Sequence, residues 1–132
     1  MSGSQNWSVR IVPAGAAAAF QPWGVDANPG DPVKAQVGDI VTWGNATTET
    51  HQPWPTEGNT PTGAPVASNP VGSGLFFSQP IGANASSTPQ YVVPATLPPA
   101  TAGGAATPLT AGSVICYCCK NHPDERGQIV IF

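Results

Sequence analysis

Strict alternation of apolar and polar side chains marks two of the strands that the sequence predicts. Between residues 8 and 12, Val9 and Ile11 alternate with polar neighbours. Between residues 33 and 37, Val33, Ala35 and Val37 alternate with a lysine and a glutamine. A period of two places every second side chain on the same face of a strand. Each segment therefore predicts a strand with one face buried and the other in water.

Short runs of β-branched and aromatic residues predict the remaining strands. These runs lie near Phe20 and over Ile40–Trp43, Leu75–Ser78, Gln90–Val93, Val114–Cys119 and Gln128–Phe132. Segments rich in Pro, Gly and Ala, at about residues 52–74 and 94–112, predict two long loops between them. Seven or eight strands without a long amphipathic helix predict an all-β sandwich or barrel.

Length and charge narrow the functional classes. A chain of 132 residues has the size of one domain, so we expect residues 1–132 to form a single domain. Only 8% of the residues are charged and the net charge is -3, which leaves no basic surface for phosphate backbones and excludes nucleic acid as the expected partner. The sequence contains no run of 18 apolar residues that would predict a transmembrane segment.

The candidate chemistry lies in His51, Cys119 and His122. Two imidazoles and one thiolate form the trigonal ligand set of a type 1 copper site, and these are the only two histidines in the chain. A cysteine and a histidine three residues apart bring two ligands together in one short loop, while His51 has to arrive from another strand. Zinc, which also favours cysteine and histidine, is the alternative metal, although structural zinc sites usually have paired ligands at both ends.

Three cysteines lie within four positions, and their odd number excludes a simple disulfide framework. Cys118 is a rival to Cys119 as the ligand, because it also lies close to His122. Alternation along the strand predicts that Cys119 points to one face and that Cys116 and Cys118 point to the other. We expect the latter two to be small buried apolar side chains.

Two motifs give the chain a resemblance to the cupredoxin family of blue copper proteins, of the plastocyanin, amicyanin and azurin type. The first is similar to the stretch that leads to the first copper histidine in plastocyanin-like proteins, and comprises Gly38, Asp39, Val41, Trp43, Asn45 and His51. The second resembles amicyanin, and comprises Tyr117, Cys119, His122, Pro123, Arg126 and Gly127. In this pattern we expect Asp39 to stabilise a turn and Asn45 to tie the ligand loop to the backbone.

The resemblance implies an eight-stranded Greek-key sandwich that holds one copper ion at one end and transfers single electrons. It also implies a monomer in the periplasm or outside the cell that exchanges electrons with a redox partner protein. The start of the sequence has no signal peptide, so we expect a leader to have been removed. The second histidine of the family lies at an apolar edge where electrons leave, which predicts an exposed patch of Pro123, Pro53 and Trp54 around His122.

Glu125 stands where the amicyanin-like pattern has its axial methionine, and the chain has no methionine beyond Met1. We expect the Glu125 carboxylate to be the fourth copper ligand. A harder, charged donor favours Cu(II) and lowers the reduction potential. The alternative is that Glu125 turns to solvent and pairs with Arg126 or Lys120.

Two other functional classes stay open beside the electron carrier. One is an enzyme or small-molecule sensor with an accessible copper coordination position, similar to the red copper protein nitrosocyanin. The other is a copper delivery or storage module, for which three cysteines and one methionine are few.

Overall fold

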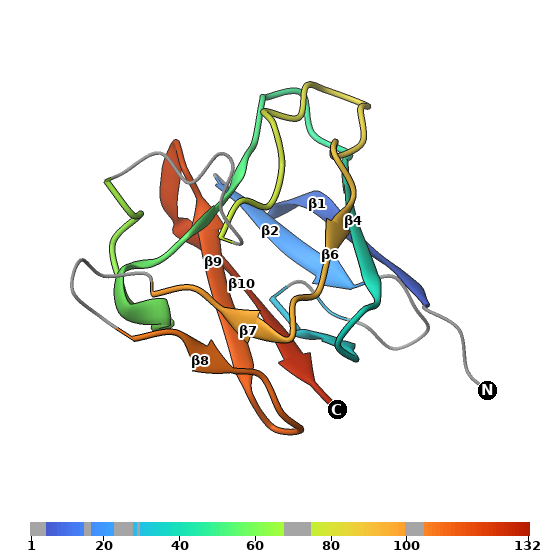
Figure 1. Ribbon diagram of the computed structural model, residues 1–132. Coiled ribbons are helices and arrows are strands. Elements are labelled where there is room, and N and C mark those ends of the chain that lie inside the picture. Colours follow the sequence, from blue (N-terminus) through green and yellow to red (C-terminus); the bar gives the residue numbers. More distant parts are fainter. Residues whose placement is uncertain (1–4, 15–16, 23–27, 29, 68–74, 100–104) are drawn as a thin grey trace.

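The structure is a computed structural model that describes residues 5–14, 17–22, 28, 30–67, 75–99 and 105–132. Over these residues the chain is almost entirely β, and its only helix is a single 3-10 turn, η1 (Glu57–Asn59). The predicted all-β sandwich is confirmed: two four-stranded sheets account for eight strands, and a separate two-stranded hairpin adds two more (Figure 1).

The first sheet contains the N-terminal strands. In spatial order it consists of β2 (Ala17–Pro22), β1 (Asn6–Ala14), β4 (Ile40–Asn45) and β6 (Tyr91–Val92). β1 is antiparallel to β2 and parallel to β4, and β4 is antiparallel to β6. Burial alternates along β4, the strand that the sequence predicts over Ile40–Trp43, with Val41, Trp43 and Asn45 turned inward.

The second sheet carries the C-terminal half of the candidate chemistry. In spatial order it consists of β3 (Val33–Ala35), β10 (His122–Ile131), β9 (Val114–Cys119) and β5 (Pro53–Pro55). β9 and β10 form a tight antiparallel pair, and β3 runs parallel to β10. The hairpin consists of β7 (Thr96–Leu97) and β8 (Thr107–Pro108).

One apolar core fills the space between the two larger sheets. Its centre is aromatic, with Trp43, Phe77, Tyr91 and Tyr117 packed edge to face or tilted against one another. The Trp43 Nε1–H group donates a hydrogen bond of 3.1 Å to the Tyr117 hydroxyl. The buried indole N–H of one sheet thus has the phenol oxygen of the other sheet as its acceptor.

Three segments differ from the sequence-based expectation. Leu75–Ser78 was expected as a strand, but it has no strand pairing, although Leu75 and Phe77 are buried in the core. The first expected loop contains β5 and η1, and the second contains β7 and β8. Residues 68–74 and 100–104 of these loops lie outside the described residues. Proline-rich strands as short as β5 escape prediction because their pairing with β9, not their own pattern, defines them.

Asp39 is buried and joins three parts of the chain. Its carboxylate accepts hydrogen bonds from the Gln5 backbone N–H (3.0 Å), the Trp7 indole N–H (2.8 Å) and the Gln36 backbone N–H (2.8 Å). Burial by itself would raise the pKa of Asp39, but these hydrogen bonds outweigh it and hold the pKa below its ordinary value. The expected structural role of Asp39 at the turn before β4 is in accord with the Gln36 bond.

We therefore expect Asp39→Asn to lower the free energy of unfolding by about 2 kcal/mol at neutral pH, because an amide cannot accept all three bonds. The stabilisation by a carboxyl group with a lowered pKa is fully present above its unfolded pKa of about 3.9 and is lost as the pH falls through the folded pKa. Urea denaturation of both proteins between pH 7 and pH 2.5 measures this difference. A gap that stays constant down to the lowest pH would contradict the carboxylate's role.

Gly127 faces the buried Tyr117 ring across the β9–β10 pair. A Cβ atom at this position would overlap the Tyr117 ring and hydroxyl, whereas a Cβ atom at Gly44 meets nothing within 4 Å. Gly127→Ala is therefore expected to cost about 3 kcal/mol, and the control Gly44→Ala close to none, in chemical denaturation. Equal stability of the two variants would show that the Tyr117 side chain moves aside at little cost in free energy.

No helix in the described part of the chain is long and apolar enough to cross a membrane.

Candidate metal centre

Four potential ligands, one from the first half of the chain and three from residues 119–125, meet at one end of the sandwich. His51 lies just before β5, where its backbone forms an isolated antiparallel bridge with Ile81. Cys119 is the last residue of β9, and His122 is the first residue of β10. Glu125 lies three residues further along β10. All four residues predicted from the sequence are thus brought together by the fold.

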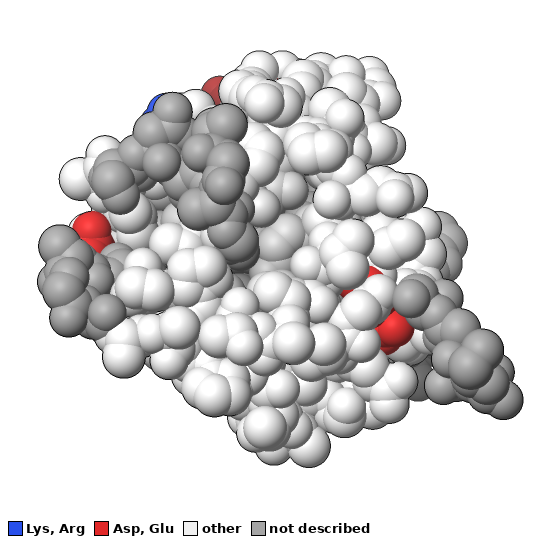
Figure 2. All heavy atoms as spheres, in the orientation of Figure 1, with Lys and Arg blue, Asp and Glu red and all other residues white. Residues whose placement is uncertain are grey.

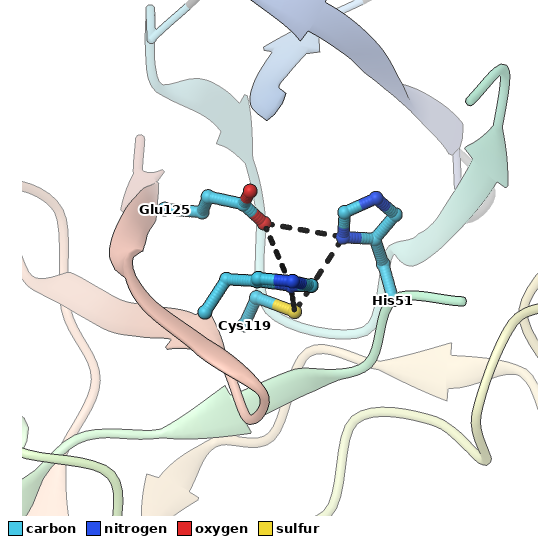
Figure 3. A group of neighbouring side chains, drawn as sticks. His51, Cys119 and Glu125 are labelled. Atoms are coloured by element: carbon cyan, nitrogen blue, oxygen red, sulfur yellow. Dashed lines mark hydrogen bonds and ion pairs between the residues drawn. The ribbon is translucent and has the colours of Figure 1, made fainter. Parts of the chain in front are cut away.

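The four donor atoms lie within 4.8 Å of one another. Cys119 Sγ is 3.6 Å from Nδ1 of His51 and 3.6 Å from Nδ1 of His122. Glu125 Oε1 is 3.1 Å from His51 Nδ1 and 3.6 Å from His122 Nδ1. Figure 3 shows the carboxylate of Glu125, the imidazole of His51 and the sulfur of Cys119 turned toward a common point.

These separations fit a metal ion at the common point. Bonds of about 2.0 to 2.3 Å from imidazole, carboxylate and thiolate put neighbouring donors of a tetrahedral site about 3.3 to 3.8 Å apart. The four separations given above run from 3.1 to 3.6 Å, and the other two of the six lie within 4.8 Å. Four of the six separations are therefore close to those that a four-coordinate ion requires.

An irregularity in β10 aims Glu125 inward. His122 pairs with Cys119, but the next paired residue of β10 is Arg126, which pairs with Cys118. The residues between His122 and Arg126 have no partner on β9, so the strand bulges, and bulges commonly redirect side chains at functional sites. The sequence predicts a loop from Cys119 to Gly127, whereas the structure has a tight turn followed by this bulged strand.

Glu125 is only 5% exposed, and its two oxygens have different surroundings. Oε2 accepts a hydrogen bond of 2.9 Å from the Ala18 backbone N–H, which fixes the orientation of the carboxylate. Oε1 is buried and accepts no hydrogen bond from any described residue, although it lies within ion-pair distance of both imidazoles. A buried carboxylate oxygen without a hydrogen bond is costly, and a cation bound between the four donors would remove that cost.

The structure distinguishes Cys119 from its neighbours. Cys119 belongs to the core cluster together with Ile115 and Tyr117, as strand alternation predicts, whereas Cys116 and Cys118 lie outside that cluster. All three thiols are buried and free, and burial raises the pKa of each. The sulfur close to both imidazoles is that of Cys119.

The pKa of Cys119 has two further influences. The Glu125 carboxylate adds to the effect of burial and raises the pKa, and hydrogen bonds from nearby backbone groups oppose both. In the metal-free protein the thiol form is therefore favoured at neutral pH. Binding of a metal through this sulfur has to release its proton.

Only one of the two histidines reaches solvent. His51 is 1% exposed, whereas the side chain of His122 is 39% exposed. Nε2 of His122 faces outward, 3.8 Å from the carboxylate of the exposed Glu49. The predicted exposed patch of Pro53 and Trp54 is wrong, because both residues are buried in β5 against β9. Of the three residues predicted for that patch, Pro123 alone is exposed.

Two contributors to the site were missed by sequence reasoning. The Ala18 N–H that holds Glu125 is a backbone group, so no residue type at that position could reveal it. Thr47, which lies 2.9 Å from His51 Nε2, stands in a run of similar polar residues that gives no indication of which one faces the imidazole. Asn45 was expected to tie the ligand loop to the backbone, and its Nδ2 group donates to the carbonyls of Glu49 and Ile81.

No protein-family model and no curated protein matches the chain. Among solved structures, the chain is similar to a proline-to-glycine mutant of amicyanin in its reduced Cu(I) form at pH 4. The sequence identity is 17% and the TM-score is 0.47, and the match covers 100% of this chain and 85% of that one. It is also similar to a methionine-to-alanine mutant of amicyanin, Cu(I), with 16% identity over 95% of this chain and 82% of that one, and a TM-score of 0.46.

Proposed function

We propose that this protein binds one copper ion through His51 Nδ1, Cys119 Sγ, His122 Nδ1 and Glu125 Oε1, and that it transfers single electrons. The observation that carries the proposal is the convergence of these four donors within 4.8 Å of one another, with Oε1 buried and without a hydrogen bond from any described residue. The resident ion would supply a one-electron change between Cu(I) and Cu(II). The residues hold the donors in place in both states.

The donor set favours copper over zinc. Sites with two imidazoles and one thiolate are typical of copper proteins that carry electrons, and Cu²⁺ binds nitrogen, oxygen and sulfur ligands more tightly than Zn²⁺ does. A buried, rigid cluster suits this task. Three of the four residues lie in strands of one sheet, so the same ligand positions serve both oxidation states with little rearrangement.

Burial of the site favours an electron carrier over a sensor or enzyme. His51, Cys119 and Glu125 are at most 5% exposed, so solvent reaches the cluster chiefly at His122. We infer that electrons enter and leave through the outward edge of the His122 imidazole. The alternative, a red-copper type of site with an accessible coordination position, has one observation in its favour: a hollow of about 240 Å³ borders His51.

Azide separates these two functions. A carrier with four protein ligands is expected to keep its visible spectrum when azide is added to the oxidised copper protein. A new azide-to-copper band would reveal a vacant coordination position and would favour the sensor or enzyme.

Copper is expected to stabilise the fold, since an ion that binds only the native state adds to the free energy of unfolding by mass action. At a free copper concentration of 100 times the Kd the gain is about 2.7 kcal/mol, or a rise in Tm of roughly 10 °C for a domain of this size. Differential scanning calorimetry under argon, with and without copper, measures this change. An unchanged Tm would mean that the four residues do not form a copper site.

A redox partner protein and a location in the periplasm or outside the cell complete the proposal. The face of the molecule in Figure 2 is largely uncharged, which agrees with a composition of only 8% charged residues. Because charges are few over the molecule as a whole, we infer that long-range electrostatic steering contributes little, and that the partner meets a surface around His122 that includes the exposed carboxylate of Glu49.

A further inference from the structure

A buried amide, that of Asn45, organises the loop between β4 and His51. Its Nδ2 group donates hydrogen bonds to the carbonyl oxygens of Glu49 (2.6 Å) and Ile81 (2.9 Å). Its Oδ1 atom accepts from the backbone N–H of Thr47 (2.9 Å) and lies 2.7 Å from the Thr47 hydroxyl. Two carbonyls on one side and a backbone N–H on the other leave only one orientation for this amide.

The Thr47 hydroxyl therefore has a defined direction. Its shortest contact is with Asn45 Oδ1 at 2.7 Å, and a second acceptor, the Glu49 carbonyl, lies at 3.1 Å. A hydroxyl group has a single hydrogen, and the Glu49 backbone N–H at 3.3 Å donates to one of its lone pairs. With the hydrogen in the short bond to Asn45, Thr47 presents its other lone pair to His51 Nε2 at 2.9 Å. This contact is a hydrogen bond only when His51 carries a hydrogen on Nε2.

The opposite tautomer of His51 is less well accommodated. A hydrogen on Nδ1 would face Glu125 Oε1 at 3.1 Å, yet Oε1 has no hydrogen bond of acceptable geometry in the described structure. That tautomer would also put two facing lone pairs between His51 Nε2 and Thr47. It would occupy, with its hydrogen, the very position toward which the four donors converge.

We propose that Thr47 is a positioning residue of the candidate metal centre: its hydroxyl accepts a hydrogen bond from His51 Nε2–H and so holds the Nδ1 lone pair toward Cys119 and Glu125. The role in metal binding rests on the proposed function, but the hydrogen bond and the tautomer exist in the metal-free protein. His51 is thereby prepared for an ion before the ion arrives. Partners of this kind, which orient a ligand without touching the metal, commonly change metal affinity about 10- to 100-fold.

The tautomer is measured in metal-free, 15N-labelled protein at pH 8 by long-range 1H–15N correlation spectroscopy. The wild type is expected to have its hydrogen on Nε2 of His51. Thr47→Val keeps the shape of the side chain but lacks the hydroxyl. In this variant the hydrogen of His51 is expected to lie on Nδ1 in a large part of the molecules. Thr47→Ser, which restores a hydroxyl, is expected to restore the wild-type tautomer. Thr48→Val, at the exposed neighbouring threonine, is the control without effect.

Affinity is measured on the same four proteins with Co²⁺ alone as the probe, by its absorption. Thr47→Val is expected to bind about 10- to 100-fold more weakly than the wild type, and Thr47→Ser and Thr48→Val to bind like the wild type. The proposal is overturned if wild-type His51 carries its hydrogen on Nδ1, a result that needs no variant to fold. It is also overturned if Thr47→Val keeps the wild-type tautomer, whatever its affinity, because the loss of the hydroxyl would then not act through His51.

The two hypotheses fail in different ways. If the wild type has the expected tautomer and loses it in Thr47→Val but takes up no Co²⁺ or copper, the metal-binding function is wrong and the hydrogen bond of Thr47 stands. If metal binds tightly but the tautomer is indifferent to Thr47, the function stands and the role of Thr47 is wrong.

Discussion

Cys119→Ser is expected to abolish the thiolate-to-copper charge-transfer band of the copper-loaded protein. Visible absorption of this kind requires a sulfur ligand, and Cys119 Sγ is the sulfur that lies 3.6 Å from both imidazoles. A serine hydroxyl is a far weaker ligand, so copper affinity is expected to fall by more than about 100-fold, beyond the effect of an outer partner. Absorption spectra and a copper titration of the purified variant measure both effects.

Cys118→Ser is the matched control for this experiment. Cys118 is adjacent in sequence and equally buried, but it lies outside the core cluster to which Cys119 belongs. The control is expected to keep the band and the affinity, at some cost in stability from burying a hydroxyl. The reverse pattern, with the band lost in Cys118→Ser and kept in Cys119→Ser, would transfer the ligand role to Cys118.

Glu125→Met is expected to raise the reduction potential and to shift the spectrum toward the blue of a site with a thioether ligand. A bound carboxylate is a charged, hard donor that favours Cu(II), whereas a thioether favours Cu(I). A preference of tenfold to hundredfold for Cu(II) corresponds to about 60 to 120 mV for a one-electron couple. Protein-film voltammetry and visible spectroscopy of the copper protein measure the two changes.

Two further variants control for charge and for shape. Glu125→Gln retains the size of the side chain and is expected to raise the potential as well, since it removes the charge beside the ion. Glu49→Gln removes an equal charge from an exposed position 3.8 Å from the outer edge of His122, and a much smaller shift is expected there. If Glu125→Met and Glu125→Gln both leave the potential and the spectrum unchanged, Glu125 is not a ligand.

Period and spacing were sufficient to predict β9, which carries Cys119, whereas the part of β10 that carries His122 and Glu125 was expected as a loop. The alternation of Ile115, Tyr117 and Cys119 predicts which thiol faces the core, because a strand has only two faces. Most of the other strand predictions hold for the same reason, with boundaries displaced by a few residues. Leu75–Ser78 fails as a strand because its apolar side chains fill the core without a neighbouring strand to pair with.

Features that depend on the pairing of distant strands could not be predicted from the sequence. The bulge between His122 and Arg126 turns Glu125 inward, and it arises from the register between β9 and β10, which no local pattern encodes. Trp54 next to a predicted ligand suggests an exposed patch, but pairing of β5 with β9 buries it. The Thr47 hydroxyl is selected from several nearby polar groups by the orientation of Asn45, which becomes evident only in three dimensions.

X-ray absorption spectroscopy at the copper edge, on protein loaded with one equivalent of copper, tests the proposed site most directly. We predict one short copper–sulfur distance, two imidazole scatterers and one further oxygen, from Cys119, the two histidines and Glu125. A copper environment of nitrogen and oxygen alone, or loading far below one ion per chain, would contradict the assignment of this protein as a copper protein with a His51, Cys119, His122 and Glu125 site.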